Sequence, residues 1–547
     1  MPSNSEIAKL KQIILNHKQI CDLELILNEA FAPLRGFMTE AEYQSVLDNT
    51  RLPSGQIWPI PVNLDVPANT DISIGEDVVL VDPYLKPLAQ MHVESVYTPS
   101  KEYEAEKVFG TSAEDHAGIR ALYEKAHSKY IGGTVKKINN IHHYDFQDIR
   151  LSPAQTKELF RQNHWEKIIG FQTRNPIHRA HFEIIKNAHT EHGANILLHP
   201  AVGPTKSGDI NYISRVRTYR AVQEKYANHF ALLSLLPLAM RMAGPKSALW
   251  HALIRKNYGC THFIIGRDHA GPGADSSGKP FYGPNEAINY VKSFEDEIGI
   301  KIITTKEMVY ASNKKTYISK DKLDETDEVK KISGTEFREM LRQNQPIPDW
   351  FSFPEVISEL KKIKRLQGNE GLVIFFTGLS GSGKTTLAES LYAYLRENQD
   401  REITFLDGDV IRQNLSKGLG FSKDDREANV KRIGFVASEI ARHGGIVICC
   451  AIAPYESSRN SNRDLINNSG KYIEVYLSTP LEVCMERDAK GLYAKVKQGL
   501  IKGFTGVDDP YEVPQDPEIT IDTSERSLNE SINEIVKYLQ SNRHLDI

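Results

Sequence analysis

Short apolar runs of strand length recur along the chain, and in its last third they alternate with segments of helical periodicity. Five of these runs predict buried strands: 371–377, 403–406, 446–451, 472–477 and 518–521. Strands that alternate with helices form a parallel sheet, because each helix carries the chain back to begin the next strand in the same direction. The last third therefore predicts a doubly wound parallel sheet.

The middle of the chain predicts a strand, a tight turn and a helix in immediate succession. The apolar run 167–171 (KIIGF) precedes the turn 172–181 (QTRNPIHRAH), and a helical pattern follows. Asn175 is a favoured N-cap and Pro176 suits the first helical position, so we expect the helix to begin there. A second apolar run, 195–199, completes a strand–helix–strand unit. In such sheets ligands bind beyond the carboxyl ends of the strands.

The turn 172–181 gathers polar side chains at a predicted helix N-terminus, where unpaired N–H groups favour an anion. His178 and His181 are three residues apart, so both are expected on one face of the helix. With Gln172 and Arg174 they predict a pocket for an oxyanion and a polyphosphate. A zinc site and two structural histidines are the alternatives, although no HExxH sequence or cysteine cluster completes a zinc site.

The first 165 residues predict a small β-rich domain. Short β-prone runs at 57–64, 77–81 and 89–96 are separated by turns rich in Gly, Pro and Asn. No catalytic set of residues stands out in this part, so we expect it to act as a scaffold.

A second glycine-rich loop follows the predicted strand 261–265, and a helix is predicted before that strand at 245–258. The loop 266–273 (GRDHAGPG) brings backbone close to a ligand and adds the cation of Arg267. Lys206, in the turn 203–209, is a further candidate phosphate contact.

A capped helix and a linker lead to the last third of the chain. Ser333 and Glu336 form a predicted capping box. The proline-rich stretch 347–354, a basic helix and the segment 368–371 mark the linker, and a new domain begins near residue 370.

The strand 371–377 is followed by a complete P-loop, GLSGSGKT. Its backbone cradles phosphates, Lys384 reaches the transferred phosphoryl group, and the Thr385 hydroxyl serves Mg²⁺. The predicted ATP-binding residues are Gly378, Leu379, Ser380, Gly381, Ser382, Gly383, Lys384, Thr385 and Thr386. The next strand ends in Asp407 and Asp409, and a carboxylate there can accept the proton of a phosphoryl acceptor.

Length and composition indicate an enzyme of small substrates. A chain of 547 residues predicts three or four domains at roughly 150 residues each. The formal net charge of −4 and the pI near 6.5 argue against general nucleic-acid binding. The longest apolar run, 230–240, is too short to span a bilayer, so we expect a cytoplasmic protein without a membrane partner. Free, buried thiols are predicted at Cys21, Cys260, Cys449, Cys450 and Cys484.

The front two thirds resemble the sulfate adenylyltransferases (ATP sulfurylases). The resemblance rests on QTRNPIHRAH, GRDHAGPG and MRMAGP (240–245), and on LILNEAFAPLRGFM (25–38) and HHYDF (142–146) in a PUA-like domain. It implies sulfate and ATP contacts at Gln172, Thr173, Arg174, Asn175, Gly266, Arg267, Asp268, His269 and Ala270. It also implies catalytic roles for Arg174, His178, His181 and Arg267, and phosphate neighbours at Ser333, Thr335 and Arg338.

The last third resembles the adenylyl-sulfate kinases. The matching blocks are 406–437, RDAKGLY (487–493) and IKGFTGVDDPYE (501–512). The resemblance implies that Lys384 and Asp409 are catalytic, with Asp409 as the base. It places the substrate adenine between Phe421 and Phe504, and assigns further substrate contacts to Asp407, Arg412, Arg426 and Asn429. The chain departs from the family at Ala453 and Glu456, where many members carry serine and a basic residue, so no phosphoserine intermediate forms here.

Together the two resemblances imply a bifunctional enzyme with four parts. These are a PUA-like domain (1–165), a Rossmann-like nucleotidyltransferase domain (166–315), a small helical domain with a linker (316–368) and a P-loop kinase domain (369–547). ATP and sulfate give adenylyl sulfate and pyrophosphate, and a second ATP phosphorylates the 3′-hydroxyl of adenylyl sulfate. Mg²⁺ accompanies ATP, no structural metal is expected, and a homo-oligomer is expected. In the alternatives the last domain is an allosteric nucleotide sensor or an NTP-driven switch for a protein partner.

Overall fold

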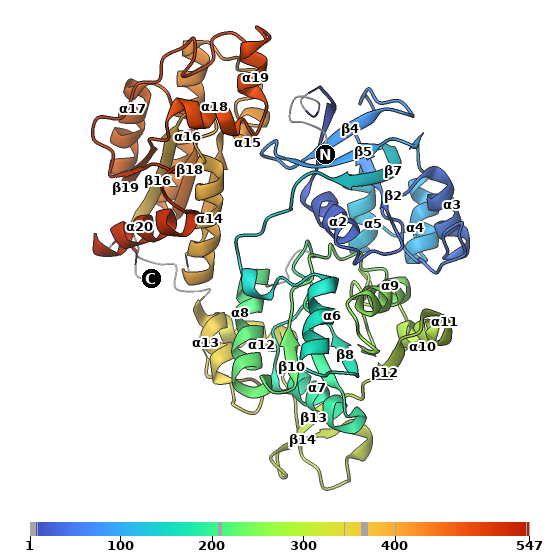
Figure 1. The fold of residues 1–547 in the computed structure, drawn as a ribbon. Coiled ribbons are helices and arrows are strands. Elements are labelled where there is room, and N and C mark those ends of the chain that lie inside the picture. The colour runs from blue at the N-terminus through green and yellow to red at the C-terminus, as the bar shows by residue number, and fades with distance from the viewer. Residues whose placement is uncertain are drawn as a thin grey trace.

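A computed structural model describes residues 7, 9–205, 210–343, 345–362, 370–399, 401–542 and 544–545. Lys206 and most of the predicted linker lie outside the described residues, as do the side chains of Thr335 and Arg338. Three groups of elements follow one another along the chain (Figure 1). The kinase-like part lies at one end of the molecule and the nucleotidyltransferase-like part at the other.

The amino-terminal part is β-rich, as predicted. Its sheet has the order β1-β4-β5-β7-β2, and β3 and β6 also pair with β7. The strands are β1 (Lys11–Ile14), β2 (Gly36–Phe37), β3 (Leu64–Val66), β4 (Asp77–Val81), β5 (Pro87–His92), β6 (Ser95–Tyr97) and β7 (Lys129–Lys137). The helices are α2 (His17–Leu27), α3 (Glu40–Asn49), α4 (Lys101–Phe109) and α5 (Ala117–Glu124).

One predicted strand of this part is wrong. Of the run 57–64, only Leu64 lies in a strand, and residues 58–63 are buried without regular structure. Pro59 and Pro61 explain the difference, because proline has no N–H to donate to a neighbouring strand.

The central part contains a five-stranded parallel sheet of order β10-β9-β8-β11-β12. Its strands are β8 (Ile168–Phe171), β9 (Asn195–Leu198), β10 (Ala231–Leu233), β11 (His262–Ile265) and β12 (Lys301–Thr304). The helices around it are α6 (Pro153–Gln162), α7 (Arg179–His192), α8 (Tyr212–Val222), α9 (Gly244–Asn257), α10 (Glu286–Lys292) and α11 (Glu295–Ile298), with short turns η1 (Gln147–Ile149) and η2 (Gln223–Ala227). The strands predicted at 167–171, 195–199 and 261–265 are confirmed.

The segment after β12, which was predicted to be helical, also contains strands. β13 (Met308–Ala311) pairs in antiparallel fashion with β14 (Thr316–Ser319) and β15 (Val329–Lys330), and η3 (Lys320–Lys322) lies between these two. The strands form because Tyr310 and Tyr317 face each other across the pair, with ring centroids 5.5 Å apart. The predicted helices are α12 (Gly334–Arg342) and α13 (Pro354–Lys362). The capping box of α12 is confirmed, since the Ser333 hydroxyl accepts from Glu336 N at 3.1 Å.

The last part is the predicted doubly wound sheet, with five parallel strands in the order β17-β18-β16-β19-β20. The strands are β16 (Gly371–Gly378), β17 (Ile403–Asp407), β18 (Ile446–Cys450), β19 (Gly470–Leu477) and β20 (Ile519–Ile521). The helices are α14 (Lys384–Asn398), α15 (Gly408–Gln413), α16 (Lys423–Arg442), α17 (Glu456–Asn467), α18 (Leu481–Arg487), α19 (Leu492–Lys497) and α20 (Leu528–Ser541).

The hydrophobic cores show which parts fold together. One cluster joins the amino-terminal sheet to one face of the central sheet, and at its centre Phe31 lies 5.7 Å from Trp58 and 5.0 Å from Trp250. Two separate clusters cover the two faces of the kinase-like sheet. That sheet therefore has a core of its own.

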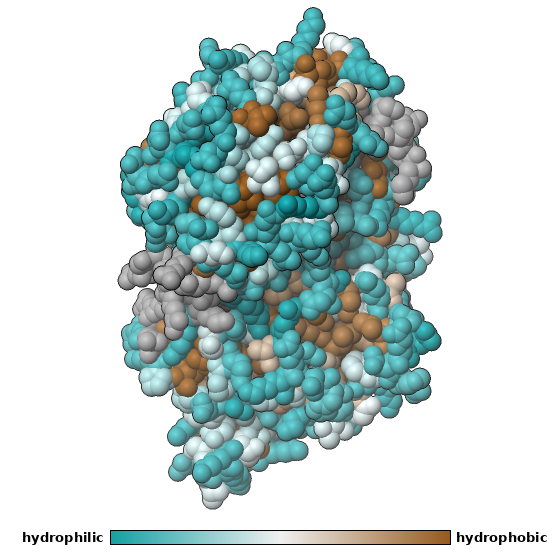
Figure 2. Space-filling view, turned by 60° about the vertical axis from the view of Figure 1, so that its left-hand side comes forward, coloured by the Kyte–Doolittle hydropathy of each residue, from teal (hydrophilic) through white to brown (hydrophobic). Residues whose placement is uncertain are grey.

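The five cysteines are free and buried, as predicted. Among the described residues, the structure has no helix that is long and apolar enough to cross a membrane. The face drawn in Figure 2 is mainly hydrophilic, and its hydrophobic groups form separate patches rather than a belt.

Candidate active sites

The turn 172–181 follows β8 as expected, but the helix after it begins later than predicted. α7 starts at Arg179 with His178 as its N-cap, whereas Asn175 and Pro176 stay in the turn. A residue before proline is disfavoured in the helical conformation, so Pro176 works against a helix that includes Asn175. The polar turn is therefore longer than the sequence suggested.

Tyr219 of α8 holds the turn 172–181 through two hydrogen bonds. Its buried hydroxyl lies 2.6 Å from the Asn175 carbonyl and 3.1 Å from the Thr173 carbonyl. The Thr173 hydroxyl in turn accepts from Asn175 N at 3.1 Å. These bonds fix the backbone that carries Gln172 and Arg174. Tyr219 was missed in the sequence, because only the fold brings α8 under the turn.

Arg174 connects the turn 172–181 to the loop 266–273. Its guanidinium donates to the Gly271 carbonyl at 3.0 Å and contacts the Met242 sulfur at 3.4 Å. Gln172 makes a similar contact, from its amide nitrogen to the Met240 sulfur at 3.4 Å. The Oε1 atom of Gln172 is buried and has no hydrogen-bond partner among the described residues. Thioether sulfur is a weak acceptor, so an incoming oxyanion would be a better partner for both side chains.

The two histidines of the turn lie together but are not charged. Their rings are 6.0 Å apart, and His181 Nδ1 accepts from His178 N at 3.3 Å. Burial lowers the pKa of His178 to about 3 and that of His181 to about 4. Both imidazoles are thus neutral near pH 7. Because His181 Nδ1 is an acceptor, its proton sits on Nε2, which remains a donor.

Phe337, Phe351 and Ser352 pack against His178. The imidazole lies 4.8 Å from the Phe337 ring and 4.9 Å from the Phe351 ring. His178 Nδ1 also forms a hydrogen bond of 2.9 Å with the hydroxyl of Ser352, which is buried. The position of this imidazole is therefore set by residues more than 150 positions later in the chain.

The GRDHAGPG loop follows β11, but its three polar side chains differ in exposure. His269 turns inward, its Nε2 lies 3.0 Å from His251 Nδ1, and burial lowers its pKa to about 3. Arg267 is exposed and lies 3.7 Å from Glu307, and Asp268 is exposed as well. Gly266 precedes them, and Ala270 has a left-handed φ of 56°. Arg267 is thus free to move toward a ligand, whereas His269 is fixed.

The P-loop connects β16 to α14 with Lys384 at the start of the helix. The Lys384 ammonium donates to the Leu379 carbonyl at 2.6 Å, so it rests on the loop's own backbone. Thr385 donates to Asp407 Oδ2 at 3.2 Å, and Asp407 Oδ1 accepts from Asp409 N at 2.8 Å. Burial, followed by the charge of Asp409, raises the pKa of Asp407. The hydroxyl and both carboxylates therefore meet at one sheet edge.

Lys490, which was not singled out in the sequence, completes this arrangement. Its ammonium forms an ion pair with Asp409. Three residues later, the Tyr493 hydroxyl donates to the Ser380 carbonyl of the P-loop at 2.8 Å. Both residues belong to the RDAKGLY block, so the block itself was the signal that could have identified Lys490.

The two residues of the predicted aromatic pair, Phe421 and Phe504, have different surroundings. Phe421 is 69 % exposed, and the Arg412 guanidinium lies 4.5 Å above its ring. Phe504 packs against Tyr493 at 5.0 Å, and no ring contact joins it to Phe421 among the described residues. The two phenyl rings are thus apart, as a pair that receives a base between them must be.

Arg426 and Asn429, two predicted substrate contacts, lie on α16. Arg426 is buried and donates to Thr505, Asp509 and the Gly503 carbonyl, so it holds the loop that carries Phe504. Asn429 is buried, and its Oδ1 has no partner among the described residues. Arg426 thus acts on the loop, and Asn429 keeps an acceptor free.

Ala453 and Glu456, where the chain departs from the kinase family, are held by backbone hydrogen bonds. Ala453 has a left-handed φ of 44°, and its carbonyl accepts from the buried Arg459 at 2.8 Å. Glu456 opens α17, and its N–H donates to Glu512 at 2.7 Å. This segment is therefore tied to the end of the loop 501–512.

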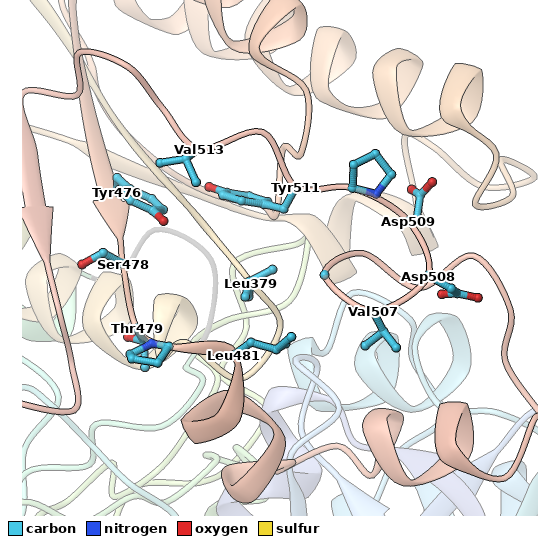
Figure 3. Close-up of a pocket in the computed structure, with 13 residues that line it drawn as sticks. Leu379, Tyr476, Ser478, Thr479, Leu481, Val507, Asp508, Asp509, Tyr511 and Val513 are labelled. Atoms are coloured by element: carbon cyan, nitrogen blue, oxygen red, sulfur yellow. The ribbon is translucent and has the colours of Figure 1, made fainter.

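A cavity of about 550 Å³ lies beside the P-loop, not over Lys384 (Figure 3). Leu379 lies in its centre, with Tyr476 and Tyr511 on one side and Asp508 on the other. Gly506 lines it as well and packs so closely on Leu379 that a Cβ atom there would lie 2.6 Å from Leu379 Cδ2. The P-loop and the Phe504 loop thus contact each other directly.

Comparison with known proteins accounts for the whole chain. Three families match in succession: the PUA-like domain over residues 2–140, ATP-sulfurylase over 147–363 and adenylylsulphate kinase over 370–522. The sulfate adenylyltransferase of Gibberella zeae is 44 % identical over 547 residues, which cover 99 % of this chain and 95 % of the relative. The chain belongs to the sulfate adenylyltransferase family.

Further relatives agree with this assignment. The sulfate adenylyltransferase of Neurospora crassa is 43 % identical over 99 % of this chain and 95 % of its own. A solved structure described as the hexameric APS kinase from Thiobacillus denitrificans is 31 % identical, covers 99 % of this chain and 95 % of its own, and superposes with a TM-score of 0.56. The resemblance to both enzyme families, and the PUA-like, nucleotidyltransferase and P-loop folds predicted with it, are confirmed.

The part of the chain that the structure describes contains no cluster of metal-binding side chains in either site. Among the described residues, no group of three or more His, Cys, Asp or Glu side chains lies close enough to hold a metal ion. His178 and His181 have the ring and hydroxyl contacts given above instead.

Proposed function

We propose that this protein activates sulfate in two steps at two separate sites. ATP and sulfate give adenylyl sulfate and pyrophosphate at the end of β8, and a second ATP phosphorylates the 3′-hydroxyl of adenylyl sulfate at the end of β17. The first product contains a mixed phosphate–sulfate anhydride, so its formation is strongly uphill. Phosphorylation in the same chain consumes that product and draws the first step forward.

In the first site, we propose that sulfate binds to Gln172 and Arg174. Both side chains now contact thioether sulfurs at 3.4 Å, and sulfate oxygens are stronger acceptors that take these donors over. A sulfate oxygen then attacks the α-phosphorus of ATP, and pyrophosphate leaves, with no covalent enzyme intermediate. His178 and His181 donate as neutral imidazoles to the triphosphate, while the exposed Arg267 supplies positive charge to the leaving pyrophosphate.

In the second site, we propose that Asp409 accepts the proton of the 3′-hydroxyl while the γ-phosphoryl group is transferred. Lys490 holds the Asp409 carboxylate in place, and Lys384 exchanges the Leu379 carbonyl for a phosphate oxygen. Phosphoryl transfer depends on positioning and charge more than on covalent chemistry, which suits this set of residues. Phe421 and Phe504 hold the adenine by stacking, which is worth about 1–3 kcal/mol per base.

The oxygen atoms around Thr385 fit a magnesium ion that arrives with ATP. The Thr385 hydroxyl and the Asp407 carboxylate lie 3.2 Å apart, and Mg²⁺ prefers oxygen ligands of this kind. We propose that Thr385 and Asp407 contact the ion or its bound waters. The ion would neutralise part of the charge on the β- and γ-phosphates.

The intact P-loop is the observation that favours a kinase over an allosteric sensor. A sensor needs only to bind a nucleotide, whereas this chain retains Thr385, Asp407, Asp409 and Lys490 in one bonded set beside Lys384 of the P-loop. An ion pair between a lysine and the carboxylate at the acceptor position serves catalysis and adds nothing to nucleotide sensing. We therefore favour the kinase.

We further propose that the protein is a homo-oligomer in the cytoplasm. The hexameric state named for the Thiobacillus denitrificans structure supports the first statement, and light scattering after gel filtration measures it directly. Five buried free cysteines and no disulfide among the described residues are typical of a reducing compartment.

The proposed domain boundaries are 165/166, 315/316 and 368/369. The separate core of the kinase-like sheet supports the last of these. A fragment of residues 370–547 should then fold and phosphorylate added adenylyl sulfate. An insoluble fragment would show that contacts such as Phe146 N to Glu397 Oε1, at 2.6 Å, are needed for folding.

The substitution Arg174→Ala tests the assignment of the two reactions to two sites. We expect it to abolish adenylyl sulfate synthesis and to leave the phosphorylation of supplied adenylyl sulfate nearly unchanged. Arg161→Ala is the matched control, since Arg161 is exposed and pairs only with its helix neighbour Glu158. Loss of both activities in folded Arg174→Ala protein would contradict separate sites.

A further inference from the structure

A second cavity, of about 580 Å³, is lined by none of the residues assigned above to the two reactions. It is formed where the amino-terminal part meets the central part. The end of α2, the segment that follows β7, the turn η1 and the start of α6 line it. Its volume falls in the range of roughly 300–1,000 Å³ that is typical of small-molecule sites.

Several side-chain donors around this cavity have no partner among the residues that the structure describes. Arg150 uses its Nε and Nη2 atoms on the Asp145 carbonyl and carboxylate, at 2.9 and 2.6 Å, which leaves Nη1. The exposed side chains of Lys137 and Asn140 form no hydrogen bond or ion pair with any described residue. Arg150 is only 11 % exposed, so it is part of the cavity wall rather than a mobile surface group.

The floor of the cavity is the strongest sign of a ligand. Tyr258 is completely buried, and its hydroxyl has no hydrogen-bond partner among the described residues. An unpaired buried hydroxyl is costly, unlike an exposed one. A bound ligand with an acceptor atom would remove this cost.

The charged group behind Tyr258, Arg255, is a cation. The Tyr258 ring lies 4.3 Å from His199, whose carbonyl accepts from the buried Arg255 at 2.9 Å. Arg255 pairs with no carboxylate among the described residues, and burial lowers its pKa to about 9. A buried cation without a counter-ion favours an anion nearby, and Arg255 lies behind the wall of this cavity through His199 and Tyr258.

The walls contain little negative charge to oppose that attraction. Among the described residues that line the cavity, Glu24 is the one carboxylate, and His143 Nε2 already bonds to it at 2.7 Å. The remaining polar lining consists of His142, Ser152 and several amides, which include Gln147 and Gln155. Amides can bind the hydroxyl groups of a small organic molecule.

We propose that this cavity binds a phosphate group, either free or esterified to a small polar molecule. Lys137 and Arg150 bind the phosphate oxygens, and the Tyr258 hydroxyl donates to the same group. The amides line the remaining volume, which is larger than phosphate alone requires. This proposal does not depend on either reaction proposed above.

Equilibrium dialysis tests the proposal on the full-length protein. The protein carries Arg174→Ala and Lys384→Ala, which weaken phosphate binding at the two proposed reaction sites. Labelled inorganic phosphate and ribose 5-phosphate are the two probes. We expect one site per chain for at least one probe, and at least ten-fold weaker binding after Lys137→Ala or Tyr258→Phe. Lys136→Ala is the matched control, because Lys136 precedes Lys137 on β7 and does not line the cavity.

The two probes also identify the form of the ligand. Tighter binding of ribose 5-phosphate indicates an esterified phosphate, and equal binding indicates that the phosphate group alone is recognised. No binding by either probe, or binding that Lys137→Ala and Tyr258→Phe leave unchanged, would overturn the proposal.

Melting temperatures without phosphate test the unpaired hydroxyl separately. Tyr258→Phe removes a group that has no partner to lose, so we expect an unchanged or higher melting temperature. Tyr219→Phe is the control, because it removes a hydroxyl that is bonded to Asn175 and should lower the melting temperature. A lower melting temperature for Tyr258→Phe would show that its hydroxyl is already bonded, which contradicts the proposed site.

Discussion

The Lys490 ammonium forms an ion pair with the Asp409 carboxylate at the edge of the kinase-like sheet. The two residues are 81 positions apart and come from different elements: Asp409 from the first turn of α15, and Lys490 from the segment between α18 and α19. The same segment reaches the P-loop through Tyr493, which donates to the Ser380 carbonyl. The proposed base is thus connected to both the cation that holds it and the loop that binds ATP.

Replacing Lys490 should therefore impair the second reaction alone. We expect Lys490→Ala to lower the turnover of adenylyl sulfate phosphorylation by about 100-fold, which is typical when one preorganised charge in an active site is removed. Lys497→Ala, an exposed change on the adjacent α19, should have no effect. Steady-state kinetics of both half-reactions give the answer. Unchanged phosphorylation would show that the ion pair is only structural.

The hydroxyl of Tyr219 should matter for the first reaction only. Tyr219→Phe leaves the Asn175 carbonyl without its 2.6 Å bond, at a cost of about 1–3 kcal/mol, and frees the turn that carries Gln172 and Arg174. We expect slower adenylyl sulfate synthesis and unchanged phosphorylation. Tyr226→Phe is the control. Tyr226 lies in η2, directly after α8, and its hydroxyl bonds to Glu355 rather than to the turn 172–181. Equal effects of the two substitutions would contradict the role of Tyr219.

Gly506 should be intolerant of a methyl group for two reasons that can be separated. Its φ of 90° disfavours any other residue, and a Cβ would lie 2.6 Å from Leu379 of the P-loop. We expect Gly506→Ala to raise the KM for ATP in the second reaction. Gly499→Ala shares the left-handed φ, at 72°, but has open space around it, so it reports the backbone effect alone. Identical kinetics for the two variants would exclude a steric effect on the P-loop.

The neutral histidines of the first site predict how stability changes with pH. Burial lowers the pKa of His181 to about 4, from about 6.5 in an unfolded chain. Between these values the unfolded state binds a proton that the folded state does not, so the free energy of unfolding decreases as pH falls from about 6.5 toward 4. We expect His181→Asn to show a smaller loss of stability over this range than the wild type.

Urea denaturation at pH 7 and at pH 5 measures this difference. His443→Asn is the control, because His443 is exposed. The wild type and the control should lose the same stability between the two pH values. If His181→Asn lost as much as they do, the imidazole would not be buried in its neutral form.

The sequence predicted the elements that depend on local pattern. The parallel sheet around β16, the strands on either side of the turn 172–181 and the capping box at Ser333 all follow from apolar runs, turn residues and caps within a few positions. The start of α7 was placed three residues too early. Asn175 and Pro176 form a good helix start by composition, but the bonds of Thr173 and Tyr219 hold them in the turn.

The properties that the sequence could not predict depend on distant residues. The charge state of His178 follows from its burial against Phe337, Phe351 and Ser352, which come from a segment that was expected to be a separate small domain. Likewise, the sequence could not show that the guanidinium of Arg426, a predicted substrate contact, also donates to the Gly503 carbonyl of the Phe504 loop. In both cases the sequence shows the residue itself but not the distant residues that it contacts.

The most direct test of the two-step account compares the wild type with Lys384→Ala. The measurement supplies labelled sulfate, ATP and Mg²⁺, with pyrophosphate removed, and separates adenylyl sulfate from its 3′-phosphorylated product. The account predicts that the wild type makes the 3′-phosphorylated product, whereas Lys384→Ala makes adenylyl sulfate and stops there. If the wild type makes only adenylyl sulfate, and Lys384→Ala changes only how the first reaction responds to nucleotide, the last domain is a sensor and the account is wrong.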